Sequence, residues 1–247
     1  NGRILHYHIN FEALEAAITP RTKLFMLCSP HNPVGRVFTR DELTRLADIC
    51  DRHNLIICSD EIHGDLILDG HHIPIASLAP EIAQRTITLM APSKTYNIPG
   101  LANSFAIVQN VELLKQVRAA ADGIVGHSDV LALTAALAAY RDGQPWLDEV
   151  LAYLQANRDL VTAYTQAHFP GVMLTHPEGT YLSWLDWRAL ELPESPFKFF
   201  LEQAKVALFD GAPFGPGGTG FTRLNFASPL PMLEAALERM RAALASR

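Results

Sequence analysis

Residues 86–97 read Thr-Ile-Thr-Leu-Met-Ala-Pro-Ser-Lys-Thr-Tyr-Asn, an apolar run followed by a proline and a lysine. Short apolar runs of this kind are typical of strands that are covered on both faces of a sheet. Lys94 therefore stands just beyond the carboxyl end of a predicted strand. Ligands of open α/β sheets bind at that end of the strands. The stretch thus predicts a buried sheet and places a lysine where a ligand would bind.

Three further runs have the same character, and amphipathic segments separate them. They occupy residues 23–28, 55–59 and 104–108. Between the first two, Thr39 and Glu42 have the spacing of a capping box, which predicts that a helix begins near Arg40. Strands that alternate with helices in this way predict an α/β fold with a mainly parallel sheet.

A second region begins after the break Asp-Gly-Gln-Pro at residues 142–145. A long helical pattern follows at 146–168, preceding elements that do not alternate strictly. Those elements are predicted strands at 172–174, 180–187 and 221–227, and predicted helices at 196–204 and 231–245. We therefore expect domains at 1–145 and 146–247, the second a small α+β domain.

Composition narrows the class of partner. The 247 residues are 49% hydrophobic and carry a formal net charge of -6, which supplies no basic field for a nucleic acid or an anionic membrane. The three cysteines, at positions 28, 50 and 58, are odd in number and lack CxxC spacing, which argues against disulfides and zinc. No apolar run is long enough to span a bilayer. We expect a soluble, cytoplasmic protein that binds a small molecule.

Two other patterns suggest sites but lack the residues that would complete them. The glycine-rich stretch 215–220 does not end in Gly-Lys-Ser/Thr, so it reads as a loop rather than a phosphate-binding loop. The histidine pairs at 6 and 8 and at 71 and 72 have no further ligands at recognisable spacing. We expect no metal site.

Four segments together match the needs of pyridoxal phosphate (PLP): residues 28–37, 59–63, 91–101 and 222–226. This cofactor requires an amine, an anion beside its pyridine nitrogen, a partner for its phenolic oxygen, and donors for its phosphate. Lys94 can supply the amine, and once displaced by a substrate it can move the α-proton as a general base. A lysine on the surface, with no such role, is the alternative.

Three residues of the earlier segments suit the cofactor's ring. Asp60 ends an apolar run, where its carboxylate could keep the pyridine nitrogen protonated; a helix N-cap or a metal ligand are its alternatives. Asn32 lies in an Asn-Pro-Val-Gly turn that could aim its amide at the phenolic oxygen, or be a turn and no more. His63 could neighbour the same oxygen, or be a structural histidine.

Two residues suit the charged ends of cofactor and substrate. Arg223 stands in a predicted apolar strand and offers bidentate geometry to a substrate carboxylate, unless an internal salt bridge occupies it. Ser93 could bind phosphate or merely cap a turn.

Taken together, these segments resemble the aminotransferase class I/II superfamily of PLP enzymes, which has fold type I. Within that superfamily, the chain is similar to the cystathionine β-lyase branch, the MalY/PatB-like carbon–sulfur lyases. The similarity lies in the amino-acid sequences of residues 30–37, 60–63 and 92–97 and in Pro-Glu-Gly-Thr-Tyr at 177–181. The resemblance implies that Lys94 forms the internal aldimine and that Asp60 pairs with the pyridine nitrogen. It also implies that Asn32 bonds the phenolic oxygen and that Arg223 receives the substrate carboxylate.

The chain departs from the family in two respects. Many class I aminotransferases have a phosphate-binding arginine where this chain has Ala102, and its absence favours the lyase branch. Family members usually have more than about a hundred residues before the segment at which this chain begins. That portion carries a backbone turn that cradles the phosphate and an aromatic side chain that stacks on the cofactor's ring. We therefore expect part of the large domain with the whole small domain.

The activity that the resemblance implies is α,β-elimination of cystathionine or a cysteine conjugate to pyruvate, ammonia and a thiol. An aminotransferase on the same scaffold is the first alternative, and a non-catalytic fragment or regulator is the second. Members of this fold type usually work as homodimers, so the resemblance also implies a homodimer.

Overall fold

The structure, a computed structural model, describes residues 3–246, and their backbone forms two compact units. The N-terminal unit contains residues 8–30 and 37–149, and the C-terminal unit contains residues 3–7, 31–36 and 150–246. Two short early stretches thus belong to the C-terminal unit, because they hydrogen-bond to strands and turns beyond residue 170. The domain limits of 1–145 and 146–247 remain a prediction.

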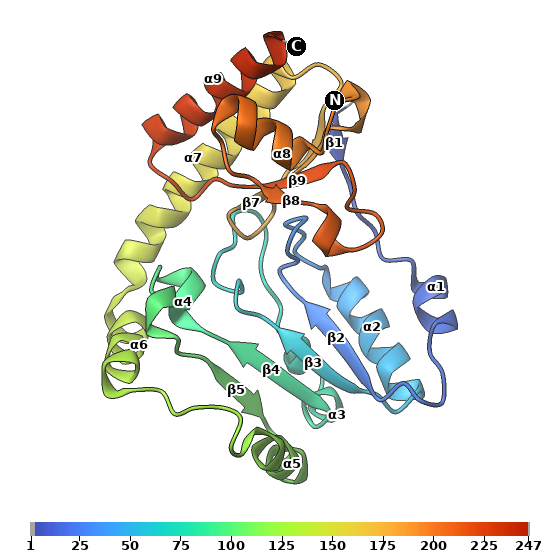
Figure 1. Ribbon diagram of the computed structural model, residues 1–247. Coiled ribbons are helices and arrows are strands. Elements are labelled where there is room, and N and C mark those ends of the chain that lie inside the picture. The colour runs from blue at the N-terminus through green and yellow to red at the C-terminus, as the bar shows by residue number, and fades with distance from the viewer. Residues whose placement is uncertain (1–2, 247) are drawn as a thin grey trace. The chain divides into compact units, whose positions relative to one another are not determined.

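The N-terminal unit is built on a four-stranded sheet in the order β2-β3-β4-β5 (Figure 1). Its strands are β2 (Leu24–Cys28), β3 (Ile56–Asp60), β4 (Thr86–Met90) and β5 (Phe105–Val108). The first three run parallel, and β5 is antiparallel to β4. The four predicted strands and the α/β fold class are confirmed.

Helices connect and flank these strands. They are α1 (Phe11–Ala16), α2 (Arg40–Arg52), α3 (Pro80–Ala83), α4 (Pro92–Thr95), α5 (Val111–Ala121) and α6 (Val130–Asp142), with 3-10 turns at Ile75–Ser77 and Pro99–Leu101. Helix α2 begins where the capping box predicts: the Glu42 amide donates to Thr39 Oγ1 at 3.2 Å, and the Thr39 amide donates to Glu42 Oε2 at 2.9 Å. Two N-terminal amides that a helix leaves unsatisfied are thereby bonded.

The two faces of this sheet differ in how far they are covered. One face packs in the main core of the unit, whose buried members are Leu27, Phe38, Leu43, Leu46, Ala47, Cys50, Leu55, Ile57, Ile75 and Ile82. Side chains alternate along a strand, so Leu24, Met26, Cys58 and Asp60 lie on the opposite face. There Met26 is 74% exposed, so within the described residues the prediction that these strands are covered on both faces is wrong at this position.

Replacing Ile57 with alanine is expected to lower the free energy of unfolding by about 2–5 kcal/mol, because the change leaves a cavity in the core. The matched control, Met26→Ala on the other face of the same sheet, should change it by less than about 0.5 kcal/mol. Urea unfolding of both variants measures the difference. Equal losses would show that the two faces are equally packed.

The C-terminal unit is built on a five-stranded sheet in the order β1-β6-β7-β9-β8. Its strands are β1 (Ile4–Leu5), β6 (Met173–Thr175), β7 (Leu182–Asp186), β8 (Phe209–Asp210) and β9 (Phe221–Asn225). Strand β1 is parallel to β6, and the other pairs are antiparallel. Glycine-rich residues 215–220 form the predicted loop, which leads into β9 and opens no helix.

Three helices belong to this sheet's unit in whole or in part. They are α7 (Gln144–His168), whose residues from 150 on lie in the unit, α8 (Pro196–Phe199), which continues as a π-helical turn over Phe200–Ala204, and α9 (Leu230–Ala245), with 3-10 turns at Arg188–Leu190 and Ala212–Phe214. Asn157 of α7 donates to the carbonyls of Phe226 and Ser228, at 2.8 and 2.9 Å, and so ties that helix to the end of β9.

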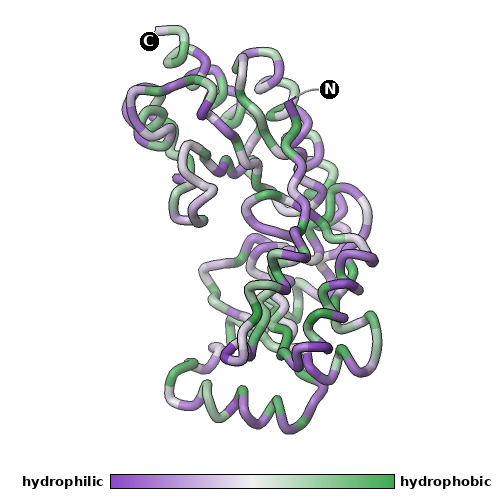
Figure 2. The backbone as a smooth tube through the Cα atoms, turned by 90° about the vertical axis from the view of Figure 1, so that its right-hand side faces the viewer, coloured by the Kyte–Doolittle hydropathy of each residue, from purple (hydrophilic) through white to green (hydrophobic). Residues whose placement is uncertain are grey.

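Hydrophobic and hydrophilic residues are interleaved along the helices, as the hydropathy colouring of Figure 2 shows. Among residues 3–246, no helix combines the length and the apolar character that crossing a membrane requires.

Candidate functional site

Lys94 follows β4 directly, in the single turn of helix α4. Its side chain is half-buried. No residue of the described chain forms a hydrogen bond or an ion pair with its Nζ atom. The ammonium group is therefore not engaged by any side chain of the described residues. The arrangement suits an amine that reacts with a ligand better than a lysine of the outer surface.

Asp60 and Glu61, adjacent in sequence, have different surroundings. Glu61 is 1% exposed, and its two carboxylate oxygens accept from Ser59 Oγ and pair with His72 Nε2, each at 2.8 Å. Asp60 is half-buried at the end of β3, on the face of the sheet that also carries Met26 and Cys58. Its Oδ1 accepts a hydrogen bond only from the Ile62 amide, at 3.2 Å. No described cation pairs with it. Of the two acids, Asp60 is the one available to a positively charged ligand group.

Asp60 and Lys94 stand at the same edge of the sheet, because β3 and β4 are parallel neighbours and each residue follows or ends its strand. Thr95 strengthens this link: its Oγ1 donates to Asp65 Oδ2 at 3.1 Å. Asp65 belongs to the turn that follows Asp60. The two predicted residues are therefore held on connected segments.

Cys58 lies on the same face of β3 as Asp60, two positions before it. Burial, and next the negative charge of Asp60, raise the pKa of the Cys58 thiol above its usual value. His63, in the turn after Asp60, is 4% exposed. Ser93 is half-buried beside Lys94. Their parts in cofactor binding remain predictions.

Asn32 and Arg223 lie in the C-terminal unit, and the structure brings them together. Arg223 Nη1 donates to Asn32 Oδ1 at 2.8 Å across 191 positions of sequence. A guanidinium can only donate, so this bond fixes the orientation of the amide. The Asn32 Nδ2 atom is left as a donor, which the predicted bond to a phenolic oxygen requires.

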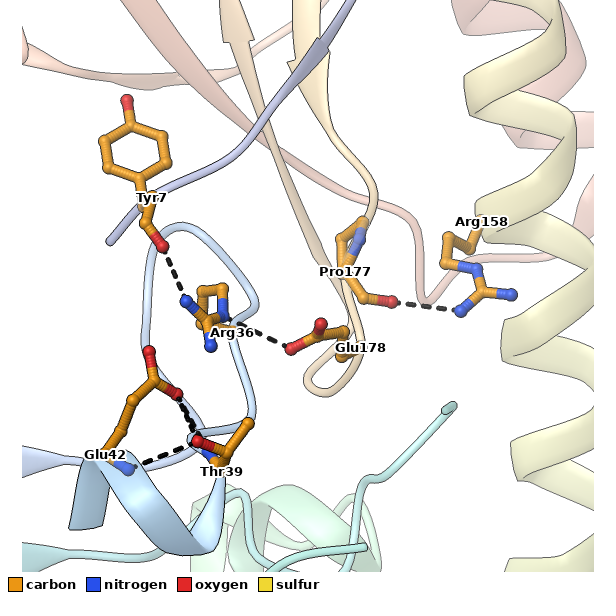
Figure 3. A network of polar contacts seen from close by, with 7 residues as sticks. All are labelled: Tyr7, Arg36, Thr39, Glu42, Arg158, Pro177 and Glu178. Carbon is orange, nitrogen blue, oxygen red and sulfur yellow. Dashed lines mark hydrogen bonds and ion pairs between the residues drawn. The ribbon is translucent and has the colours of Figure 1, made fainter. Parts of the chain in front are cut away.

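The turn that carries Asn32 is anchored on residues 177–179, as Figure 3 shows in part. The Gly35 carbonyl accepts from the amides of Glu178 and Gly179, at 2.8 and 3.0 Å. Arg36 adds a 3.4 Å ion pair with Glu178 and donates to the Tyr7 carbonyl at 2.6 Å. Gly35 has φ +74°, and a Cβ there would lie 2.5 Å from that of Pro177, so no other residue fits.

Arg223 is half-buried in β9 and has no carboxylate partner among residues 3–246, so the internal salt bridge that the sequence left open is not present there. Its guanidinium carbon instead lies 4.4 Å from the ring centre of Phe209 and 5.1 Å from that of Phe214. Burial lowers its pKa. A cation with these neighbours still has N–H groups to offer to an anion.

The structure thus groups the predicted residues in two sets. Asp60, His63, Ser93 and Lys94 belong to the N-terminal unit, and Asn32 and Arg223 to the C-terminal unit. Sequence reasoning missed the Glu61–His72 pair, the Asp65 link and the two rings at Arg223. Of these features, only the rings at Arg223 had a signal in the sequence, because Phe214 adjoins the glycine-rich loop that precedes Arg223.

Comparison with known proteins gives consistent matches. The model of the family "Aminotransferase class I and II" matches residues 4–240. Cystathionine beta-lyase PatB of Bacillus subtilis is 41% identical over 99% of this chain and 67% of its own length. Protein MalY of Escherichia coli is 40% identical over 90% of this chain and 57% of its own length. Cystalysin from Treponema denticola, whose crystal structure contains pyridoxal 5'-phosphate, superposes with a TM-score of 0.94 at 36% identity, covering 98% of this chain and 62% of that one.

The chain therefore spans between 57% and 67% of the length of these proteins.

Proposed function

Because the chain belongs to the aminotransferase class I and II family, we propose that it forms the lysine-bearing part of a PLP-dependent carbon–sulfur β-lyase. The observation that carries the proposal is the pair of unneutralised charges, Lys94 and Asp60, at the carboxyl ends of neighbouring parallel strands. PatB supports it, since this relative, 41% identical to the chain, is a cystathionine beta-lyase.

The described residues fit the cofactor in the chemistry of their donors. An amine, a carboxylate and a guanidinium each lack a partner of opposite charge among residues 3–246, and PLP with an amino acid presents an aldehyde, a ring nitrogen and a carboxylate. Lys94 would hold the aldehyde carbon, Asp60 the ring nitrogen and Asn32 Nδ2 the phenolic oxygen. Ser93 is the residue that we assign to the phosphate.

When bound, PLP withdraws electrons from the α-carbon of an amino acid joined to it. Asp60 would support that withdrawal, because its negative charge would keep a proton on the ring nitrogen. Arg223 binds the substrate's carboxylate and so orients the α-carbon. Lys94, released by the substrate's amine, accepts the α-proton at Nζ.

Loss of that proton leaves an electron pair that expels the sulfur on the β-carbon. The C–H bond at the α-carbon and the C–S bond at the β-carbon break, and a new C–C double bond forms between them. The sulfur leaves as a thiolate, which takes up a proton. Water then converts the three-carbon remainder to pyruvate and ammonia. The substrate is cystathionine or a related cysteine conjugate.

We expect the purified protein, supplied with PLP, to release pyruvate from cystathionine. Coupling to lactate dehydrogenase measures the pyruvate, and amino-group transfer to a 2-keto acid is measured beside it. Transfer without pyruvate would make the protein an aminotransferase. Absence of a cofactor absorbance band would make this chain a non-catalytic scaffold.

Two further properties belong to the proposal through the family resemblance. The protein would work in the cytoplasm, and it would form a homodimer. Size-exclusion chromatography with light scattering tests the second.

A further inference from the structure

The guanidinium of Arg223 is contacted by aromatic rings where a half-buried arginine ordinarily meets an acid. Its only hydrogen bond to a described residue goes to the Asn32 amide oxygen. Phe209 and Phe214 approach its central carbon within 4.4 and 5.1 Å of their ring centres. All four residues belong to the C-terminal unit.

This choice of neighbours has a chemical consequence. A carboxylate side chain would occupy the N–H fork that an incoming carboxylate uses, and would compete with it. An aromatic face attracts the cation through its quadrupole and carries no net charge, so the N–H groups that do not bond Asn32 have no competing acid. The rings therefore stabilise the guanidinium without neutralising it.

The fold brings both rings to Arg223 by specific means. Phe209 is the cross-strand partner of Arg223 in the β8–β9 pair, so the two side chains share a face of the sheet. Trp184 is its partner on β7, and Phe214 packs edge-on against that indole at 5.3 Å. Phe214 thus approaches Arg223 from outside the strands.

The glycine-rich loop at 215–220 explains how Phe214 comes to lie next to Arg223. Backbone runs against backbone where Gly211 meets Gly218, and a Cβ on Gly218 would overlap the Gly211 carbonyl. The Gly211 amide donates to the Phe221 carbonyl at 3.0 Å and closes the loop onto β9. The loop therefore folds back onto β9, the strand that carries Arg223, and Phe214 immediately precedes the loop.

We propose that Phe209 and Phe214 are positioning residues that hold the Arg223 guanidinium while leaving it free to bind the substrate's carboxylate. The identity of the substrate in this inference rests on the proposed function. The preference of Arg223 for a carboxylate is independent of the proposed function.

Replacing Phe209 with aspartate places a competing acid beside Arg223, and Phe209→Asn is the matched neutral control. Phe209 is 62% exposed, so neither change should unfold the protein. We expect the KM for cystathionine to rise on the order of 10-fold more in the aspartate variant than in the asparagine variant, with kcat within about twofold in both. Equal KM values for the two variants would overturn the proposal.

Phe214 gives a second test, which separates ring chemistry from packing. Phe214→Leu should raise KM by about 3- to 30-fold, the range of a lost cation–π contact, and Phe214→Tyr, which keeps the ring face, should restore the value of the unaltered protein. If leucine and tyrosine behave alike, or if kcat falls while KM is unchanged, Phe214 does not act through Arg223.

A binding measurement keeps this inference separate from the lyase assignment. Propionate, a carboxylate that cannot react, is titrated into the purified protein by calorimetry. Binding that weakens in Phe209→Asn, which loses the ring, and is lost in Phe209→Asp, which adds a competing acid, supports the inference even if cystathionine is not cleaved. Failure of pyruvate release alone overturns the proposed function, whereas identical propionate affinities in the two variants overturn the inference.

Discussion

Replacing Lys94 with alanine is expected to remove the cofactor's absorbance band at about 420 nm and to lower the rate of pyruvate release by at least about 10³-fold. Two losses combine in this variant. The amine that would hold the aldehyde carbon is gone, and so is the base for the α-proton. No other described lysine follows a strand of the N-terminal sheet in the same way, so no neighbour can replace it.

The control for this change is Lys115→Ala. Lys115 lies on α5, is mostly exposed, and pairs with Glu112 at 2.8 Å. A surface ion pair of this kind is worth about 0–1 kcal/mol, so the control should keep the band and the activity. A Lys94→Ala protein that retains the band would show that the cofactor is held by another amine.

Replacing Asp60 with asparagine is expected to lower the rate of pyruvate release by about 10- to 1,000-fold with little change in stability. Asparagine keeps the size of the side chain and removes its charge. The pKa of the ring nitrogen should then fall by about one to three units, because a nearby opposite charge is lost. The pH dependence of the cofactor's absorbance, measured beside kcat, tests that cause.

Asp48→Asn serves as the matched control, since Asp48 is an exposed acid on α2. It should leave both the spectrum and kcat unchanged. If Asp60→Asn behaves like this control, the ring nitrogen does not depend on Asp60, and the assignment of the cofactor's orientation fails.

Much of the fold follows from local pattern. The runs at 23–28, 55–59 and 86–90 are short and apolar, which indicated a mainly parallel sheet, and the structure has β2, β3 and β4 there. The predicted cover on both faces is wrong at Leu24 and Met26, which are exposed on one face. The Thr39–Glu42 box placed the start of α2 correctly, because a capping box depends only on residues three positions apart.

Other elements had too little local signal. Strands β1 and β8 have two residues each, and both exist only because a partner strand is present. Helix α6, at 130–142, has apolar residues around most of its circumference, so its sequence shows no clear amphipathic period. Neither kind of element can be recognised without its tertiary neighbours.

The sequence by itself determined which residue types stand at the ends of the strands: Lys94 after β4, Asp60 at the end of β3, and Asn32 in a turn that only glycine at 35 permits. These are local facts of composition and spacing. The tertiary structure decided which charges are available. It buried Glu61 against His72 and left Asp60 without a cation, and it surrounded Arg223 with rings instead of an acid. Pairing and burial join residues far apart in the chain, so no local pattern contains them.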